Sequence, residues 1–217
     1  MIRMKKLFTC FALCLVAITV NAQSCPDNHH PHMIDLGMPS GTLWSCCNVE
    51  TDHPENQSPT NYGGYYAWGE TETKAICNWS TYAHCDGTKE TCHDLGTDIS
   101  GTEYDVAHVK WGGSWRMPMK EQCQELVDNC TYTWTTVNGV KGGMFTSKQN
   151  GNSIFLPAAG SRWGESLYSV GYFGHYWAST QGTSYSDSAY GLCFYPRDAL
   201  RDDGYRYRGR PIRPVSR

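Results

Sequence analysis

Residues 111–130 read WGGSWRMPMKEQCQELVDNC, and this stretch predicts the point where a glycine-rich loop passes into a helix. Pro118 suits the first turn of a helix, where its missing N–H costs nothing. Apolar residues then recur at the i, i+3, i+4 and i+7 spacing of one helical face. We expect that face to be buried, and it consists of Cys123, Leu126, Val127 and Cys130. We expect the polar residues of the helix to point toward water, and these are Glu121, Gln122, Glu125 and Asp128.

The two cysteines of this stretch cannot bond to each other while the helix stands. Seven helical residues rise by about 10 Å, whereas a disulfide needs Cα atoms within about 7 Å. Two interpretations stay open for Cys123 and Cys130. They are small apolar residues of the core, or one of them forms a disulfide with another element.

The N-terminus predicts export. A basic start with Arg3, Lys5 and Lys6 precedes the apolar run LFTCFALCLVAITV, and Ala22 ends a small-residue cleavage site. We therefore interpret residues 1–22 as a signal peptide, which sends the chain to the periplasm, the cell surface or the medium. A lipoprotein signal would use Cys25, but Ala22 and Gln23 fit its apolar position poorly.

The rest of the chain has the size of one domain and an acidic balance. The chain has 18 basic and 21 acidic residues. Without the three basic residues of 1–22, the balance is 15 to 21, a net charge of −6. No basic stripe is available for nucleic acid. No second apolar segment is long enough to span a membrane. We predict neither kind of partner.

Composition favours a β-rich domain. Tyr, Trp and Gly are frequent and the apolar runs are short, as in chains with many short strands and glycine turns. Residues 23–32 are expected to be a flexible lead-in to a single domain at 33–217. Residues 71–103 are expected to be a long segment outside the core, called the excursion below, that is held by a crosslink rather than by apolar packing. Strands are expected at 33–36, 42–49, 65–70, 154–160, 175–180, 189–195 and 210–215.

Several blocks of the sequence resemble a known family. They are IDLGMPSGTLWSCCNV at 34–49, YYAWGETET at 65–73, ISGTEYDVAHVKWGGSWRMP at 99–118, NGNSIFLPAAG at 150–160, HYWAST at 175–180 and RGRPIRPV at 208–215. In this order they look like the Fibrobacter succinogenes major paralogous domain, a family of secreted proteins of Bacteroidetes. The resemblance extends over residues 33–216.

The resemblance implies a fold class and a set of neighbours. The family is similar to C-type-lectin-like domains and to the formylglycine-generating enzyme superfamily. This implies an α+β domain with two helices, small and mostly antiparallel twisted sheets, extensive ordered loops, and terminal strands that lie close together. The chain departs from the family at Met119, where a threonine usually caps the helix. It departs again at Cys123, where a large aromatic is usual.

Nine cysteines follow residue 22, and an exported chain can keep disulfides. Family members often carry a pair at the positions of Cys85 and Cys92, so a local disulfide is predicted there. Cys77 joins this cluster or pairs elsewhere. Cys46 and Cys47 are expected to point to opposite faces of a strand, and so not to pair with each other. Cys47 and Cys130 stand where the family tends to have cysteine, as a core disulfide or as two buried thiols.

No catalytic or metal site is predicted. The chain has no G-x-S-x-G elbow, no Walker loop and no H-E-x-x-H, C-x-x-C or EF-hand pattern. The cysteine pair of the formylglycine-generating enzyme has no counterpart, because Cys193 is the one cysteine after Cys130. His29, His30 and His32 could hold a metal ion loosely, but a fixed site needs a second shell. No cofactor is predicted, although a calcium ion held by loop carbonyls would leave no trace in the sequence.

These observations predict a non-catalytic binding or adhesion module of the bacterial envelope, with an extracellular glycan or protein as ligand. The alternatives are an enzyme of the formylglycine-generating type and a structural envelope subunit. The stretch 184–208 is rich in the residue types of recognition surfaces, although its tyrosines would also suit strand packing. The candidate ligand-binding residues are Tyr185, Asp187, Tyr195, Arg197, Arg201, Asp203, Tyr205 and Tyr207. Arg197, Arg201 and Asp203 are expected in a polar connection, and Leu192 and Phe194 in the core.

Overall fold

The computed structural model describes residues 25, 27, 29–50, 58–183 and 185–217. The interpretation of residues 1–22 as a signal peptide lies outside the described residues. Within them, no helix is long and apolar enough to cross a membrane.

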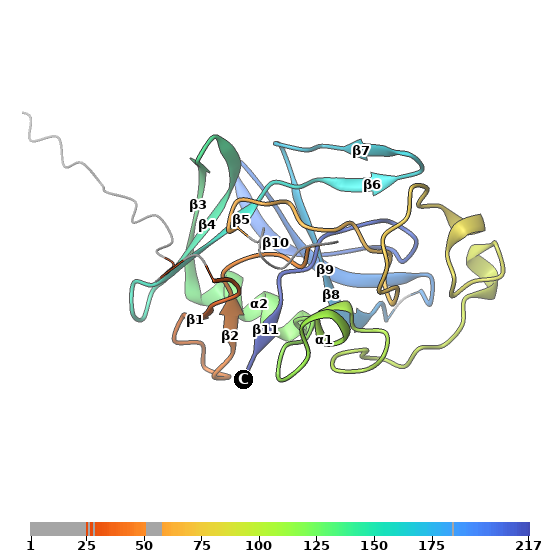
Figure 1. Ribbon diagram of the computed structural model, residues 1–217, viewed down its shortest axis with the longest axis horizontal. Coiled ribbons are helices and arrows are strands. Elements are labelled where there is room, and N and C mark those ends of the chain that lie inside the picture. The colour runs from red at the N-terminus through yellow and green to blue at the C-terminus, as the bar shows by residue number, and fades with distance from the viewer. Residues whose placement is uncertain (1–24, 26, 28, 51–57, 184) are drawn as a thin grey trace, which may run out of the picture.

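The described residues form four small antiparallel sheets and two α-helices (Figure 1), so the predicted α+β class is confirmed. The sheets have the strand orders β1-β2-β11, β3-β4-β5, β10-β9-β8 and β6-β7. The helices are α1 (Val106–Trp111) and α2 (Lys120–Asn129), with two 3₁₀ turns, η2 (Trp79–Thr81) and η3 (Lys89–Thr91). The strands are β1 (Met33–Asp35), β2 (Leu43–Ser45), β3 (Cys130–Val137), β4 (Val140–Ser147), β5 (Ser153–Pro157), β6 (Ser161–Trp163), β7 (Ser166–Tyr168), β8 (Gly174–Gln181), β9 (Ser188–Tyr195), β10 (Asp198–Tyr205) and β11 (Val215–Ser216).

The first and last strands share one sheet, as the resemblance implied. β2 pairs with β1 on one side and with β11 on the other. The C-terminal strand therefore lies beside β2, near the beginning of the domain (Figure 1). This three-stranded sheet therefore holds the beginning and the end of the domain together.

The stretch 111–130 runs from the last residue of α1 through a loop into α2. Its pattern predicts the loop and the helix that follows it. Asp105 caps α1, and its carboxylate accepts backbone N–H groups from Ala107 and His108 and also from Gly101 and Met117. One side chain thus fixes both the helix start and the strand-like residues that follow the helix. Gly112 ends α1 with a φ of 65°, a conformation that suits glycine.

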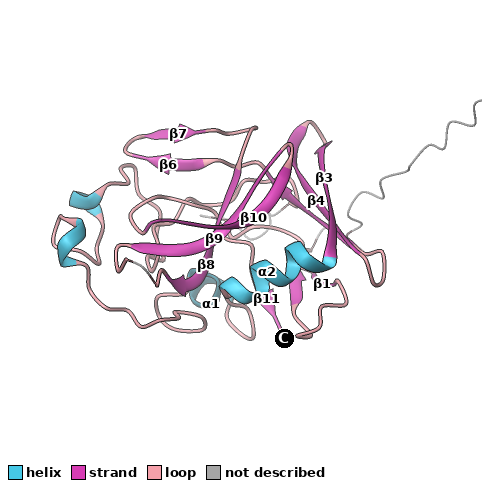
Figure 2. Cartoon of the chain, turned by 180° about the vertical axis from the view of Figure 1, so that it is seen from behind, coloured by secondary structure: helices cyan, strands magenta, loops and turns pink. Residues whose placement is uncertain are grey.

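Figure 2 shows helix α2 beside the sheets. The helix buries the predicted face, because Cys123 and Leu126 are fully buried in the main core. Gln122, expected to point toward water, is buried instead. Its Nε2 donates to Thr42 and its Oε1 accepts from the backbone N–H of Met119. Thr180 of β8 accepts the N–H of Lys120. The capping groups that Met119 does not supply therefore come from within the helix and from a neighbouring strand.

Several strands differ from the expectation. The segment 65–70 makes one isolated bridge, between Tyr66 and Arg210, and β2 ends at Ser45. Cys46 and Cys47 lie in a bend, so strand alternation does not apply to them, and their side chains hydrogen-bond to each other. Three elements were not predicted: the β3–β4 hairpin, the β6–β7 hairpin and strand β10. The β3–β4 hairpin turns at Asn138 and Gly139, and both residues have positive φ.

The main core lies between α2, the β3-β4-β5 sheet and the β10-β9-β8 sheet. Leu192 and Phe194 of β9 point into it, as predicted. The excursion at 71–103 is held by apolar packing as well as by a disulfide. Its residues Tyr82 and Cys85 pack with Ala67 and Tyr207 in a small apolar cluster. Figure 1 shows this segment at one end of the molecule, beyond the sheets.

The last segment of the chain carries three buried arginines. Arg206, Arg210 and Arg213 are each at most 1% exposed. Arg213 donates to the side chain of Asn48 and to the backbone carbonyls of Ser45 and Phe155, at 2.7–3.1 Å. It thereby joins β2, β5 and the path to β11 through a single side chain.

We expect Arg213→Met to lower the free energy of unfolding by about 3 kcal/mol or more, because three buried acceptors lose a charged donor. Chemical denaturation of the purified protein measures this. Arg197→Met, at an exposed position, is the matched control and should change stability little. Equal effects of the two variants would contradict a central role for Arg213.

Candidate functional site

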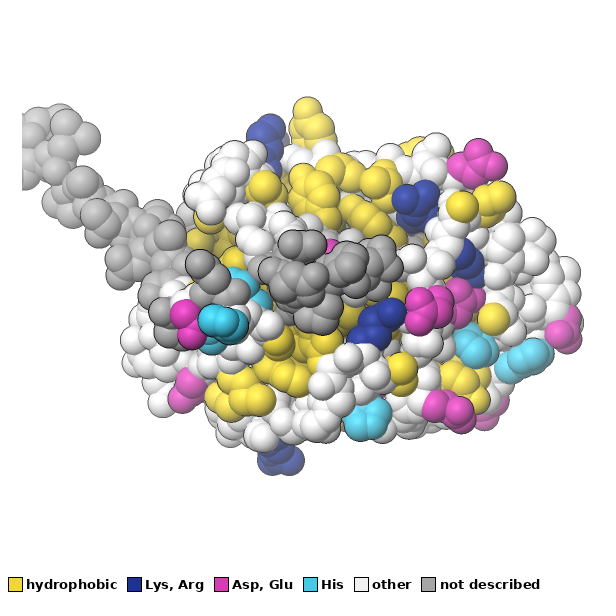
Figure 3. Space-filling model, in the orientation of Figure 1, with side chains coloured by type: hydrophobic (Ala, Val, Ile, Leu, Met, Phe, Trp, Pro, Cys, Tyr) yellow, Lys and Arg dark blue, Asp and Glu magenta, His cyan; other side chains and the backbone are white. Residues whose placement is uncertain are grey.

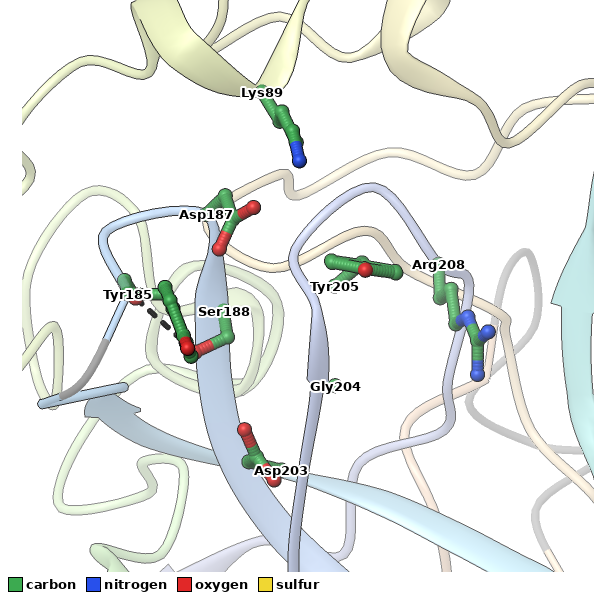
Figure 4. Close-up of a pocket in the computed structure, with 8 residues that line it drawn as sticks. All are labelled: Lys89, Tyr185, Asp187, Ser188, Asp203, Gly204, Tyr205 and Arg208. Atoms are coloured by element: carbon green, nitrogen blue, oxygen red, sulfur yellow. Dashed lines mark hydrogen bonds between the residues drawn. The ribbon is translucent and has the colours of Figure 1, made fainter.

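An open hollow of about 530 Å³ lies where the excursion meets the β9–β10 hairpin. We call it the Tyr205 hollow, and its lining consists of Lys89, Tyr185, Asp187, Ser188, Asp203, Gly204, Tyr205 and Arg208. Figure 4 shows Lys89 reaching from the excursion toward the rim that carries Asp187, with the Tyr205 ring between Asp187 and Arg208. Three segments far apart in the sequence therefore build one concave surface.

Strand register brings the floor of the hollow together. Tyr205 lies opposite Ser188 across the β9–β10 ladder, and Asp203 lies opposite Tyr190. The turn before β9 is held by Ser188, whose N–H and hydroxyl both donate to the carbonyl of Tyr185. The Tyr185 side chain is 69% exposed and stands at the edge.

Aromatic rings form one side of the hollow. Tyr205, 43% exposed, stacks on the buried Tyr207, and the indole of Trp79 meets both rings edge-on. The guanidinium of Arg208 lies over the ring of Tyr205 at 5.7 Å and over that of Trp163 at 5.4 Å. Arg208 therefore links the hollow to the exposed β6–β7 hairpin, where Figure 3 shows apolar side chains gathered at the surface.

Behind this surface, Arg206 holds the three segments in place. Its guanidinium donates to the hydroxyl of Tyr82 and to the carbonyls of His93 and Ser186, and it lies 4.6 Å from the ring centre of Trp68. Burial raises the pKa of Tyr82, so its hydroxyl stays neutral, accepts from Arg206 and donates to the carbonyl of Trp68. The excursion and the turn before β9 are thus fastened to the same cation.

Gly204 is required by the second buried arginine. A Cβ at this position would come within 2.1 Å of Nη2 of Arg210. Arg210 also pairs with Asp202 at 3.3 Å and lies 4.2 Å above the Trp177 ring. β10 can therefore pass over this guanidinium only with a glycine at 204.

The structure brings together half of the predicted ligand-binding residues. Tyr185, Asp187, Asp203 and Tyr205 line the Tyr205 hollow, and Tyr207 lies buried behind it. The other three lie elsewhere, and they are Tyr195, Arg197 and Arg201.

One positional expectation for these residues is wrong. Arg201 and Asp203 are in strand β10 rather than in a connection, and the turn itself contains Arg197. Tyr195 is half-buried, with its ring against Phe173. Arg201 lies over the ring of Tyr190.

Four lining residues were missed by sequence reasoning: Lys89, Ser188, Gly204 and Arg208. Lys89 stands far away in sequence, so only the tertiary fold places it there. Arg208 is one of five arginines between 201 and 213, and their alternation does not say which are buried. The pairing of Ser188 with Tyr205 was hidden because β10 was not predicted as a strand.

A second hollow of about 750 Å³ borders the first. It lies between the end of the excursion, the start of α2 and the 180–186 segment, with Asp98, Lys120 and Ser186 in its lining. Lys120 also lies 4.8 Å from the ring centre of Tyr190. The residues around 185–187 therefore separate two concave surfaces.

The cysteines are mostly structural. Cys85 and Cys92 form the predicted disulfide, which closes the loop that carries Lys89. Cys123, Cys130 and Cys193 are buried thiols, and burial raises the pKa of each to about 12. Burial also raises the pKa of Cys77, which lies beneath the β6–β7 hairpin. A protonated thiol is a poor nucleophile.

His175, Cys193 and Asp202 form a compact group with potential ligand atoms within 4.8 Å of one another. The guanidinium of Arg210 already occupies the open side of the Asp202 carboxylate. Burial alone would raise the pKa of Asp202, but the neighbouring His175 and the charge of Arg210 outweigh burial and lower it. The group is therefore a partly buried ion pair, in which a cation already engages the Asp202 carboxylate.

Comparison with known proteins gives no match to a protein-family model, to a curated protein sequence or to a solved structure.

We expect the double variant Cys85→Ser/Cys92→Ser to lose about 2–3 kcal/mol of unfolding free energy, because the disulfide restricts the unfolded chain. Chemical denaturation with and without a reductant measures this: the reductant should destabilise the wild-type protein and leave the double variant unchanged. Non-reducing peptide mapping that finds both thiols free would contradict the prediction.

We expect the stability difference between wild type and Asp202→Asn to shrink as the pH falls. The folded-state pKa of Asp202 is lowered, so its contribution is complete above the unfolded pKa and is lost on acidification through the folded pKa. Denaturation curves between about pH 5 and about pH 2 measure this. The exposed neighbour gives the control, Asp203→Asn, which should show no such convergence.

Proposed function

We propose that this chain is an exported, non-catalytic binding module of the bacterial cell envelope, and that its ligand, a glycan or a protein, binds at the Tyr205 hollow. One observation carries the proposal. Exposed aromatic faces and side chains of both charges converge there on a rigid support. Tyrosine offers a large contact area at little entropic cost, and arginine offers several fixed donors.

The distribution of charge favours recognition over catalysis at this surface. Lys89 and Arg208 face Asp187 and Asp203 across an open hollow, and all four remain accessible to water. General acid–base or nucleophilic chemistry usually relies on a desolvated group with a perturbed pKa. The thiols of Cys123, Cys130 and Cys193 do not line the hollow, and burial raises the pKa of each to about 12.

Arg208 is the most informative single contact. Its guanidinium is positioned by the rings of Trp163 and Tyr205, and its Nε is buried, so its terminal Nη groups are the donors left for a ligand. A cation that is held by ring faces can still donate in its own plane. A carboxylate or a set of hydroxyl groups placed on the Tyr205 ring would meet these Nη groups.

We further propose that the fold is C-type-lectin-like and of the Fibrobacter succinogenes major paralogous domain type. The shared sheet of β1, β2 and β11, the two helices and the long packed excursion support this assignment. In such domains the binding surface is usually built from long loops and the strands beneath them. The Tyr205 hollow has that composition, because it combines the excursion with β9 and β10.

We expect Tyr205→Ala and Arg208→Ala each to weaken ligand binding at least tenfold, about 1.4 kcal/mol, while the fold stays intact. The ligand is first identified on glycan and protein arrays with the purified protein, and affinities are then measured by calorimetry. Arg201→Ala is the matched control, an arginine on a tyrosine ring outside the hollow. Loss of binding in the control but not in Tyr205→Ala, or turnover in a hydrolase screen without binding on either array, would overturn the proposal.

A further inference from the structure

The described part of the lead-in folds back onto the end of β2, where it places four sulfur and nitrogen ligands together. Cys25, His30, His32 and Cys46 each present one potential ligand atom, and all of these atoms lie within 4.8 Å of one another. Figure 3 shows histidine side chains gathered next to an acidic side chain where the lead-in meets the domain.

Backbone pairing fixes the geometry of this group. The N–H of Cys46 donates to the carbonyl of His32, and the N–H of His32 donates to Sγ of Cys46. The rings of His30 and His32 meet edge-on, with their centroids 5.1 Å apart. Their Nδ1 atoms lie 3.2 Å and 3.7 Å from Sγ of Cys46.

These distances suit a tetrahedral zinc ion. With Zn–S of about 2.3 Å and Zn–N of about 2.0–2.1 Å, ligand atoms in a tetrahedron are separated by about 3.4–3.8 Å. The two printed separations fall at or near this range, and the widest pair needs to close by only about 1 Å. Two thiolates and two imidazoles also form a ligand set that zinc prefers over calcium or magnesium.

An outer carboxylate completes the arrangement. Nε2 of His32 lies 3.1 Å from Oδ1 of Asp27, while its Nδ1 faces Cys46. A histidine that binds a metal through one ring nitrogen commonly donates from the other to a carboxylate, which fixes the tautomer and the ring orientation. His29 is excluded from the group, because its side chain is 97% exposed.

We propose that Cys25, His30, His32 and Cys46 bind a structural zinc ion, which fastens the lead-in to the β1-β2-β11 sheet. All four coordination positions are filled by the chain, so the ion stabilises and does not catalyse. The site ties the start of the described chain to the strand that also pairs with its end.

Zinc titration of the purified, reduced protein tests the proposal. We expect one zinc per chain, a higher thermal midpoint with zinc, and a lower midpoint after chelation. Asp27→Asn should weaken binding by about 10–100-fold, and His32→Ala and Cys46→Ser should weaken it further. His29→Ala is the matched control and should bind as the wild type does.

Cobalt(II) substitution gives a second readout, because thiolate ligands produce a sulfur-to-metal charge-transfer band that Cys25→Ser should diminish. Circular dichroism of each variant shows whether the fold is retained, and Asp27→Asn, at a half-exposed position, changes no ligand. Equal loss in His29→Ala and His32→Ala, absence of binding at micromolar zinc, or a Cys25–Cys46 disulfide or an acylated Cys25 in the protein isolated after export would overturn the proposal.

Discussion

The burial of three guanidinium groups in the last segment constrains the rest of the structure. Arg206, Arg210 and Arg213 lie in the interior, where an unpaired charge would cost several kcal/mol. Each is therefore surrounded by acceptors or ring faces from other segments. Arg213 takes its acceptors from β2, from β5 and from Asn48, while Arg210 pairs with Asp202 of β10 and covers Trp177 of β8. No segment of this set can move without exposing a buried charge.

This constraint also explains why the hollow has a defined shape. The excursion contains two short 3₁₀ turns and one disulfide, and isolated bridges at Cys77 and Asp98 tie its two ends to Gly164 and Thr180. Arg206 fixes the part between these bridges through Tyr82 and His93, and the same guanidinium fixes Ser186 on the opposite wall. The exposed side chains of Lys89 and Tyr205 project from a backbone that the buried arginine holds in place. Recognition surfaces benefit from this combination, because a prearranged backbone loses little entropy on binding.

Two predictions from local pattern were confirmed. The apolar spacing of 123–130 located α2, and alternation along 189–195 placed Leu192 and Phe194 in the core. The failures share a cause. β10 is rich in Asp and Arg, so its composition resembles a loop, yet it pairs with β9 along its whole length. Gln122 was assigned to water by its polarity, yet the helix start needs its amide as a capping group.

The sequence by itself determined the buried face of α2, and it also encodes the Asn138–Gly139 turn that we did not predict, because both features depend on residues that are close together in the chain. The tertiary structure decided which arginines are buried and which remain exposed. Arg206 and Arg208 are two residues apart and chemically identical, and they differ only in what the excursion and the β6–β7 hairpin place around them. It also decided that Cys46 meets the lead-in histidines. Burial and pairing of this kind depend on segments distant in sequence, and no local pattern encodes their partners.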